Sequence, residues 1–239
     1  MSNQLAPSEW TPHFTCQYID MERQYEMLRI AYALRHQVYC VECNFLPAED
    51  YPDELERDQF DARSAHFGAR NLLKELVGYV RLVTAREDDI FPFEQYCQEF
   101  LPHIERPSRH ESAEISRLIV RHDYRRRRGD TLSGVTIQVL EPGSQEIVND
   151  RRKPPEMLLG LYRQMYMFSI RSGIRYWYAA MEKPLARALS QLGFQFTRIS
   201  PEIDYYGAVA CYLADLRQLE AHLQHRNPEL LSWFRQEIS

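Results

Sequence analysis

Acidic and arginine side chains recur in this sequence in a pattern that could support acid–base chemistry. Glu56, Asp58 and Asp61 lie within six residues, and carboxylates this close repel one another unless cations approach them. Arg81 stands in the middle of the apolar segment LVGYVRLV, where a buried guanidinium would need anions because a lone buried charge is very unfavourable. The Asp58/Asp61 pair and Glu114 are the available anions. On its own, the acidic segment is more typical of a solvated turn.

Glu114 and Arg117 form a second pair, in the segment EISRLIV. Residues three apart in a regular strand face opposite sides of a sheet, so both could line one site only if the strand bulges between them. Free backbone N–H groups at such a bulge could polarise a carbonyl, as an oxyanion hole does. We therefore predict that the strand ladder is interrupted between Ile115 and Val120.

Four consecutive arginines, Arg125 to Arg128, precede Gly129. A strand, then such a run, then a connection to a helix is an arrangement in which backbone N–H groups hold a pyrophosphate and arginines supply the counter-charge. A solvated basic loop is the more common origin of such a run. With Arg121 and residues 151–153, the run could also form a basic rim that attracts an acidic partner.

Composition limits the classes of function. The chain has 239 residues and a formal net charge of -5, which argues against a surface built to bind nucleic acid. It has no apolar run of about 18 residues and no signal-peptide pattern at its start, so the expected location is the cytoplasm. Cys40 and Cys43 form a CxxC motif without a second pair, and we expect thiols and no metal site.

Hydrophobic periodicity predicts an α/β sandwich around one mixed sheet. The sequence favours an N-terminal arm over 1–20, a main domain over 21–216 with an insertion at 129–155, and a helical tail over 217–239. The loop over 44–58 is long enough to suggest a function. Expected helices cover 21–43, 93–100, 156–172 and 184–192, and expected strands cover 64–69, 76–85, 114–120, 174–181, 194–199 and 208–216.

The motifs together resemble a known family. Arg35 in LRHQVYCVECNF, the acids of ELERDQFD, Arg81 in VGYVRLV and the segment EISRLIV are similar to those of acyl-homoserine lactone (autoinducer) synthases and N-acyl amino acid synthases. The segments VYCVECNFLP and AEISRLIV, followed by the arginine run, resemble most those of the acyltransferases associated with the PEP-CTERM/exosortase system. The likeness runs from about Arg23 to Arg128. It implies the GCN5-related N-acetyltransferase (GNAT) fold, in which a mixed sheet splays at its fourth strand so that the pantetheine arm of an acyl thioester can enter.

The resemblance also implies the residues of the site. Residues expected to act in catalysis or around the acceptor amine are Arg35, Glu56, Asp58, Asp61, Arg81, Glu114 and Arg117. Residues expected to bind the donor are Leu118, Val120, Arg125, Arg126, Arg127, Arg128 and Gly129. No tightly bound cofactor is implied, because acyl carrier protein or acyl-CoA would serve as the donor substrate. Arg81 and the distant acids should meet at a wet cleft beside the opened sheet.

The expected function is transfer of an acyl group, in these relatives a long chain, from a carrier-protein or CoA thioester to the amine of an amino-acid-like acceptor. Glu114 would accept the amine proton, directly or through water. The segment LYRQMYMFSI over 161–170 could line a pocket for the chain, although a core helix is its more common role. One alternative is an autoinducer synthase that uses S-adenosylmethionine. A second is a non-enzymatic module that binds nucleic acid or a membrane surface through the arginine run.

Overall fold

The computed structural model describes residues 13–124, 156–205 and 207–236. In these residues a seven-stranded sheet has the strand order β1-β2-β3-β4-β5-β7-β6. β4 and β5 are parallel, and the other neighbours are antiparallel. The strands are β1 Thr15–Ile19, β2 Ser64–Arg70, β3 Leu76–Thr84, β4 Ser112–Val120, β5 Tyr176–Met181, β6 Thr197–Asp204 and β7 Ala208–Asp215.

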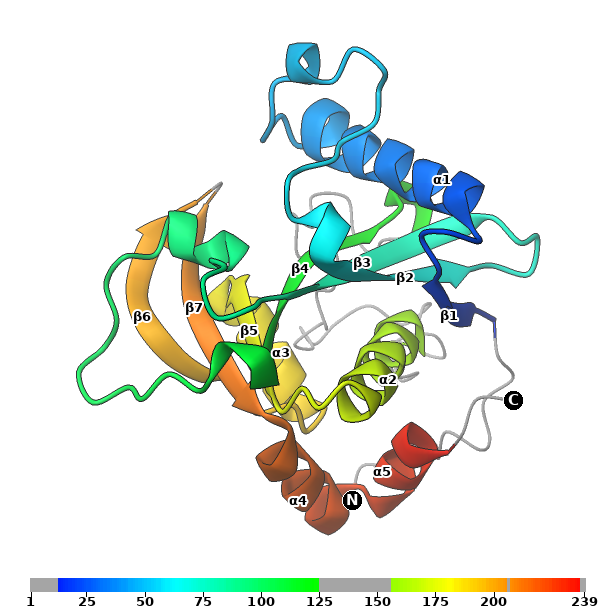
Figure 1. The fold of residues 1–239 in the computed structure, drawn as a ribbon. Helices are drawn as coiled ribbons and strands as arrows, with labels where there is room; N and C mark the ends of the chain where they lie inside the picture. The colour runs from blue at the N-terminus through cyan, green and yellow to red at the C-terminus, as the bar shows by residue number, and fades with distance from the viewer. Residues whose placement is uncertain (1–12, 125–155, 206, 237–239) are drawn as a thin grey trace, which may run out of the picture.

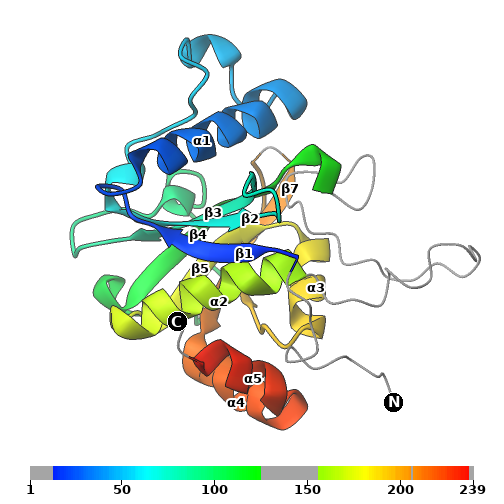
Figure 2. The same cartoon turned by 90° about the vertical axis from the view of Figure 1, so that its right-hand side faces the viewer.

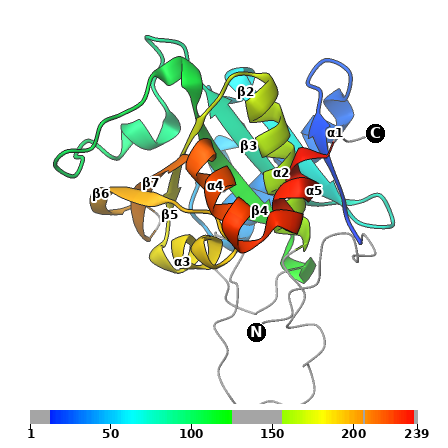
Figure 3. The ribbon, with the colours of Figure 1, turned by 90° about the horizontal axis from the view of Figure 1, so that it is seen from below.

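Helices cover both faces of this sheet (Figures 1 and 2). α1 lies on one face, over β1 to β4, and a connection between β3 and β4 covers the rest of that face. The other four α-helices lie on the opposite face, where they pack into one core with the sheet (Figure 3). The α-helices are α1 Tyr25–His36, α2 Glu156–Arg171, α3 Lys183–Gln191, α4 Leu216–Arg226 and α5 Pro228–Arg235. This architecture confirms the predicted mixed α/β fold.

The ends of two helices follow from their glycines. α2 is followed by Gly173 with φ of +74°, and α3 by Gly193 with φ of +99°, which is the left-handed conformation that glycine adopts most readily. A Cβ at Gly193 would also lie 2.5 Å from the side chain of Leu223 in α4, which would have to move. The predicted helix ends at these two glycines are confirmed.

β4 and β5 separate from each other part of the way along their length. Their register runs only from Ser112 opposite Tyr176 to Ile115 opposite Ala179, although β4 continues to Val120 and β5 to Met181. Beyond this point the two strands share no ladder, which opens the sheet. The predicted splay at the fourth strand is therefore confirmed.

A β-bulge follows directly on the β4 side of this opening. Arg81 pairs with Ser116, but Tyr79 pairs with Ile119, so β4 carries one extra residue opposite Val80. Arg117 has φ of +55°, a conformation that side chains other than glycine adopt at a cost. The interruption predicted between Ile115 and Val120 is confirmed, with Arg117 as its strained residue.

Several sequence-based boundaries were wrong. Residues 15–19 are not part of an arm, because they form β1, which pairs with β2 and buries Ile19 completely. The helix predicted over 21–43 is α1 followed by a π-helical turn over Gln37–Glu42. The helix predicted over 93–100 is only the 3₁₀ turn Pro92–Gln95. The arginine run and the insertion lie outside the described residues, and the described part of the tail contains the helices α4 and α5. None of the described helices combines the length and apolarity needed to cross a membrane.

Candidate active site

Six charged side chains from distant parts of the chain meet between α1 and the sheet. They come from α1, the loop over 44–63, β3 and β4. Three guanidinium groups face three carboxylates, so the group is electrically balanced. We call it the ionic cluster, and its members are Arg35, Glu56, Asp58, Asp61, Arg81 and Arg117.

Asp61 joins α1 to β3 within the ionic cluster. Its Oδ1 accepts from Nη1 of Arg35 at 2.6 Å and from Nη1 of Arg81 at 2.7 Å. Arg35 also donates through Nε to Glu56 at 2.5 Å. Arg81 binds both carboxylate oxygens of Asp58, at 2.6 and 2.7 Å. The loop over 44–63 is thus held against the sheet by charge-assisted hydrogen bonds, which are among the stronger kinds.

Arg117 closes the cluster on the side of the bulge. Its Nη2 donates to Glu56 at 3.0 Å and to Asp58 at 3.2 Å. Its guanidinium lies 5.0 Å from the ring centre of Tyr39, in the π-helical turn. The bulge brings Arg117 to the face of the sheet that carries Glu114 and Arg81. The three-residue spacing between Glu114 and Arg117 required such a bulge.

The ionic cluster is mostly buried, which corrects the expectation of a wet cleft. Arg35, Glu56 and Arg81 are fully buried, and only Asp58 and Arg117 are exposed to a modest degree. Burial raises the pKa of Glu56, but Arg117 and Arg35 outweigh it and lower this pKa to about 2. For Asp61 burial is likewise outweighed by Arg35 and Arg81, so its pKa is also lowered. These acids are ionised and engaged, which suits them to hold structure.

His66 and Tyr79 extend the cluster into the sheet. His66 Nε2 lies 3.2 Å from the carbonyl oxygen of Asp61, and Nδ1 lies 2.6 Å from the hydroxyl of Tyr79. Because the carbonyl can only accept, these partners place the proton on Nε2 and make Nδ1 the acceptor. Burial lowers the pKa of His66 to about 4. This histidine is therefore a neutral bridge.

Glu114 is buried in a different way. It forms none of the ion pairs found among the described residues, and its Oε2 accepts from the backbone N–H of Phe93 at 2.9 Å. Burial raises its pKa to about 8, although the Phe93 N–H, Arg81 and Arg117 act in the opposite direction. The sequence had left Glu114 open as a partner of Arg81; the structure gives that role to Asp58 and Asp61.

A slot of about 130 Å³ runs through the opening between β4 and β5 and reaches Glu114. On the side of α1 its wall includes Tyr39 and Phe93, and on the opposite side it includes Tyr162 of α2 and Leu185 of α3. Glu114 and Arg117 are therefore brought to one cavity. The other five members of the ionic cluster lie behind this wall and do not line the slot.

The expected donor-binding residues have different positions. Leu118 lines the slot, whereas Val120 is buried in the core beneath α2. Arg125, Arg126, Arg127, Arg128 and Gly129 lie outside the described residues, and so do residues 151–153. Arg121 is described, and it pairs with Glu75 and Asp123.

The helix α2 is chiefly a core helix. Met165 is fully buried within the core that it shares with the sheet. Tyr162 is the member of the segment 161–170 that lines the slot. The pocket for an acyl chain proposed for this segment is thus limited to one side chain in the described residues.

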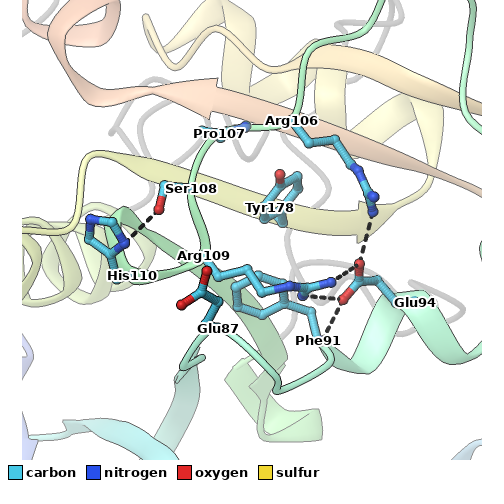
Figure 4. A pocket seen from close by; sticks show the side chains of 9 residues that line it. All are labelled: Glu87, Phe91, Glu94, Arg106, Pro107, Ser108, Arg109, His110 and Tyr178. Atoms are coloured by element: carbon cyan, nitrogen blue, oxygen red, sulfur yellow. Dashed lines mark hydrogen bonds and ion pairs between the residues drawn. The ribbon is translucent and has the colours of Figure 1, made fainter.

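Sequence reasoning missed the part played by the connection between β3 and β4. It supplies Pro92 and Phe93 to the slot. It also borders a second hollow of about 570 Å³, whose wall includes Phe91, Glu94, Arg106, Arg109 and Tyr178 (Figure 4). The segment FPFE could have indicated this, because two aromatic side chains so close together tend to be buried against other elements.

Comparison with known proteins agrees with this geometry. A model of the Acetyltransferase (GNAT) domain matches residues 34–134. The fold is similar to that of the AHL synthase LasI, at 15% identity and a TM-score of 0.57, over 86% of this chain and 91% of that one. It is also similar to BjaI with MTA, described as a CoA-dependent acyl-homoserine lactone synthase, at 19% identity and 0.56, over 89% and 88%.

A third similar structure is FeeM, an N-acyl amino acid synthase from uncultured soil microbes. The identity is 13% and the TM-score 0.50, over 89% of this chain and 96% of that one. The search of curated proteins returned no match to this sequence. The match over residues 34–134 and these structural similarities agree on a GNAT-like mixed α/β fold.

Proposed function

We propose that this protein is an N-acyltransferase that moves an acyl group from a thioester to the amine of an amino acid or a similar small acceptor. The observation that carries the proposal is the slot between the separated strands β4 and β5, which leads to the buried carboxyl of Glu114. The lining of this slot includes side chains from both sides of the sheet, and in the proposed reaction the thioester and the amine approach each other from opposite sides. The GNAT match and the acyltransferases of similar fold support this reading.

Glu114 is the base in the proposed reaction. The amine must be neutral before it attacks the thioester carbonyl, and a carboxylate beside the slot can accept its proton, directly or through water. A pKa of about 8 makes Glu114 a stronger base than an ordinary glutamate, although the carboxyl is then mostly protonated at neutral pH. The new C–N bond forms, the C–S bond breaks, and the thiolate leaves with one proton that the base returns, while the second proton lost by the ammonium group is released to water.

The bulge at Arg117 provides electrostatic stabilisation of the tetrahedral intermediate in the proposed reaction. A bulge leaves an extra residue outside the strand ladder, so its N–H can donate to the oxyanion of the tetrahedral intermediate. The charge of Arg117 at the wall of the slot favours the same negative species. The remaining ionic cluster has a supporting role, because it fixes the loop over 44–63 and the bulge relative to β3.

The donor is proposed to be acyl carrier protein or acyl-CoA, and a long acyl chain is the preferred one. A similar structure contains BjaI with SAM and isopentyl-CoA, which makes CoA thioesters and S-adenosylmethionine necessary members of any substrate panel. Association with the PEP-CTERM/exosortase system and a cytoplasmic location stay predictions from the sequence.

The proposal is tested by incubating the pure protein with acyl-carrier-protein and acyl-CoA thioesters of several chain lengths, amino acids and S-adenosylmethionine. Mass spectrometry then identifies the product. An N-acyl amino acid is expected. A lactone would instead indicate an autoinducer synthase, and salt-sensitive DNA binding without any acyl transfer would favour the binding module.

The variant Glu114→Gln tests whether Glu114 acts as a base or only as a hydrogen-bond acceptor that holds the structure. Gln can accept the Phe93 N–H bond but cannot take up a proton, so we expect kcat/KM to fall by roughly 10²- to 10⁴-fold. In the wild type, kcat/KM should rise with pH through about 8 as Glu114 ionises. Glu111→Gln is the matched control, because Glu111 lies three residues earlier and pairs at the surface with Arg175; its activity should be unchanged. Full activity of Glu114→Gln would remove Glu114 as the base.

A further inference from the structure

The hydrogen bond that Glu114 receives comes from a turn with its own anchor. Phe93 lies in the 3₁₀ turn Pro92–Gln95, and its N–H donates to Glu114 at 2.9 Å. The ring of Phe93 also packs on Tyr178, with ring centres 4.9 Å apart, and Tyr178 stands opposite Glu114 in the register of β4 and β5. The position of this turn therefore sets the surroundings of Glu114.

Glu94, the next residue, fastens the turn at three points. Its carboxylate accepts from the N–H of Phe91 at 2.8 Å. It also accepts two bonds from Arg109, at 2.6 and 2.9 Å, and one from Arg106 at 3.0 Å (Figure 4). We call this set, formed by Glu94, Arg106 and Arg109, the Glu94 clamp.

The Glu94 clamp joins two distant parts of the connection between β3 and β4. β3 ends at Thr84 and β4 begins at Ser112, so the polypeptide between them would have much freedom without an internal tie. Arg109 lies in the 3₁₀ turn that leads directly into β4. The clamp thus couples the Pro92–Gln95 turn to the start of the strand that carries Glu114. Glu94 lines the second hollow and does not line the slot.

We infer that Glu94 is a positioning residue for the proposed base: by binding Arg106 and Arg109 it holds the Phe93 N–H on the carboxyl of Glu114. This inference rests on the proposed function only for its effect on turnover. A hydrogen bond from an N–H favours the charged carboxylate, so a loose turn leaves Glu114 protonated to a higher pH. Glu94 touches no reacting atom.

Direct charge effects have to be separated from this effect of position. The charged or titratable groups around Glu114 are Arg63, Arg81, Glu94, Arg117, Tyr178 and Cys211. The charge of Glu94 itself raises the pKa of Glu114. Removing that charge alone would therefore lower this pKa, whereas releasing the Phe93 N–H would raise it.

Two variants that break the same clamp with opposite changes of charge make the distinction. In Glu94→Gln a negative charge is lost, and in Arg109→Gln a positive charge is lost. If charge acts directly, the pKa of Glu114 shifts in opposite directions in the two variants. If position matters, it rises in both, because both free the Pro92–Gln95 turn. Glu87→Gln is the control, since Glu87 borders the same hollow and has no hydrogen bond or ion pair in the part of the chain that the structure describes.

The measurement does not depend on turnover. The protein is labelled with ¹³C at the side-chain carboxyl of glutamate, the signal of Glu114 is assigned by its loss in Glu114→Gln, and its titration is followed by NMR. We expect the midpoint to move upward in Glu94→Gln and Arg109→Gln and to stay in place in Glu87→Gln. Exchange of the Phe93 amide should become roughly tenfold faster in the first two variants.

Kinetic measurements then compare the wild type with Glu94→Gln, Arg109→Gln and Glu87→Gln, using an active thioester and amine pair. The pH midpoint of kcat/KM should move with the NMR midpoint. Opposite NMR shifts in Glu94→Gln and Arg109→Gln, or an unmoved midpoint with folded variants, would overturn the positioning role. An upward NMR shift in a protein that transfers no acyl group would leave the positioning role standing and reject the proposed function.

Discussion

Buried acids at two places on the same face of one sheet have pKa values shifted in opposite directions. In the ionic cluster, Glu56 and Asp61 each touch two arginines, and their pKa values are lowered. Glu114 lies two residues before Ser116, whose hydroxyl accepts from Arg81 at 3.4 Å. Yet Glu114 has a backbone N–H in place of a guanidinium, and burial raises its pKa to about 8.

The difference teaches how burial is divided between structure and reactivity. A buried carboxylate with two arginines is fixed in its charged form, so it holds elements together and is a weak base. A buried carboxyl with a single N–H donor can change its charge near neutral pH, which is the property a base needs. The same desolvation acts on both, and the number of guanidinium partners decides the outcome.

Breaking the ionic cluster from inside should have the largest effect. In Arg35→Met, Glu56 and Asp61 each lose one buried partner, and we expect the free energy of unfolding to fall by about 3–5 kcal/mol, as for other broken buried pairs. Urea denaturation followed by circular dichroism measures it. Arg29→Met is the matched control on the same helix: Arg29 is exposed and pairs weakly with Glu26, so its loss should be below about 0.5 kcal/mol.

A loss below about 1 kcal/mol in Arg35→Met would mean that water or rearranged side chains replace the guanidinium. The cluster would then resemble a surface network, and the contrast with Glu114 would disappear. Equal losses in Arg35→Met and Arg29→Met would lead to the same conclusion.

The pairing of Arg81 with the acids of the ionic cluster could be predicted from the sequence because charge balance demands it, whereas the membership of Arg35 was implied only by the resemblance to acyl-homoserine lactone synthases. Three acids within six residues and an arginine inside an apolar strand each need partners, and each finds them in the other group. The bulge was predictable for a similar reason, since Glu114 and Arg117 could not otherwise share a face. The order of strands and helices followed from periodicity and from glycines at helix ends.

The burial of the cluster could not be predicted in this way. Pairing rules state which charges meet and say nothing about how deeply the loop over 44–63 packs beneath α1. β1 was missed because residues 15–19 expose part of their side chains at the sheet edge, and only Ile19 is fully buried. The anchor of Glu114 was missed because it is a backbone N–H, and every residue except proline carries one.

The ionic cluster and Glu114 should change the free energy of unfolding with pH in opposite directions. Glu56 contributes stability above its ordinary pKa of 4.5 that is lost as pH falls toward about 2. Glu114 contributes stability below 4.5 that is lost as pH rises toward about 8, since the folded protein must then hold a buried charge. Between pH 6 and pH 7 this second contribution should change by about 1.4 kcal/mol.

Glu114→Gln removes the second slope and leaves the first. We expect the variant to gain about 1.4 kcal/mol relative to the wild type when pH is raised from 6 to 7, measured by urea denaturation at each pH. The acid limb below pH 4.5 should be shared by both proteins, because the ionic cluster is intact in each. Parallel curves for the two proteins between pH 6 and pH 7 would show that Glu114 is already ionised there.

Tyr79→Phe should have a smaller effect, because it changes a neutral member next to the cluster. The variant keeps the buried ring but takes the donor from His66 Nδ1, which leaves a buried acceptor without its partner. We expect a loss of about 1 kcal/mol in the free energy of unfolding. Thermal unfolding at pH 7 measures it, with Tyr166→Phe as the control on the far face, where the hydroxyl bonds Glu220. An unchanged melting temperature in Tyr79→Phe would indicate that His66 is not held as a bridge.

Arg121→Gln should have the smallest effect, although Arg121 has as many acidic partners as Arg81. Arg121 pairs with Glu75 and Asp123 at 3.2 and 2.8 Å, but all three side chains reach solvent, where water competes for them and salt screens them. We expect the free energy of unfolding to change by less than about 0.5 kcal/mol, and raising the salt concentration should remove even this difference. A loss comparable to that of Arg35→Met would show that the number of partners matters more than burial. The division between structural and reactive acids would then have to be explained without desolvation.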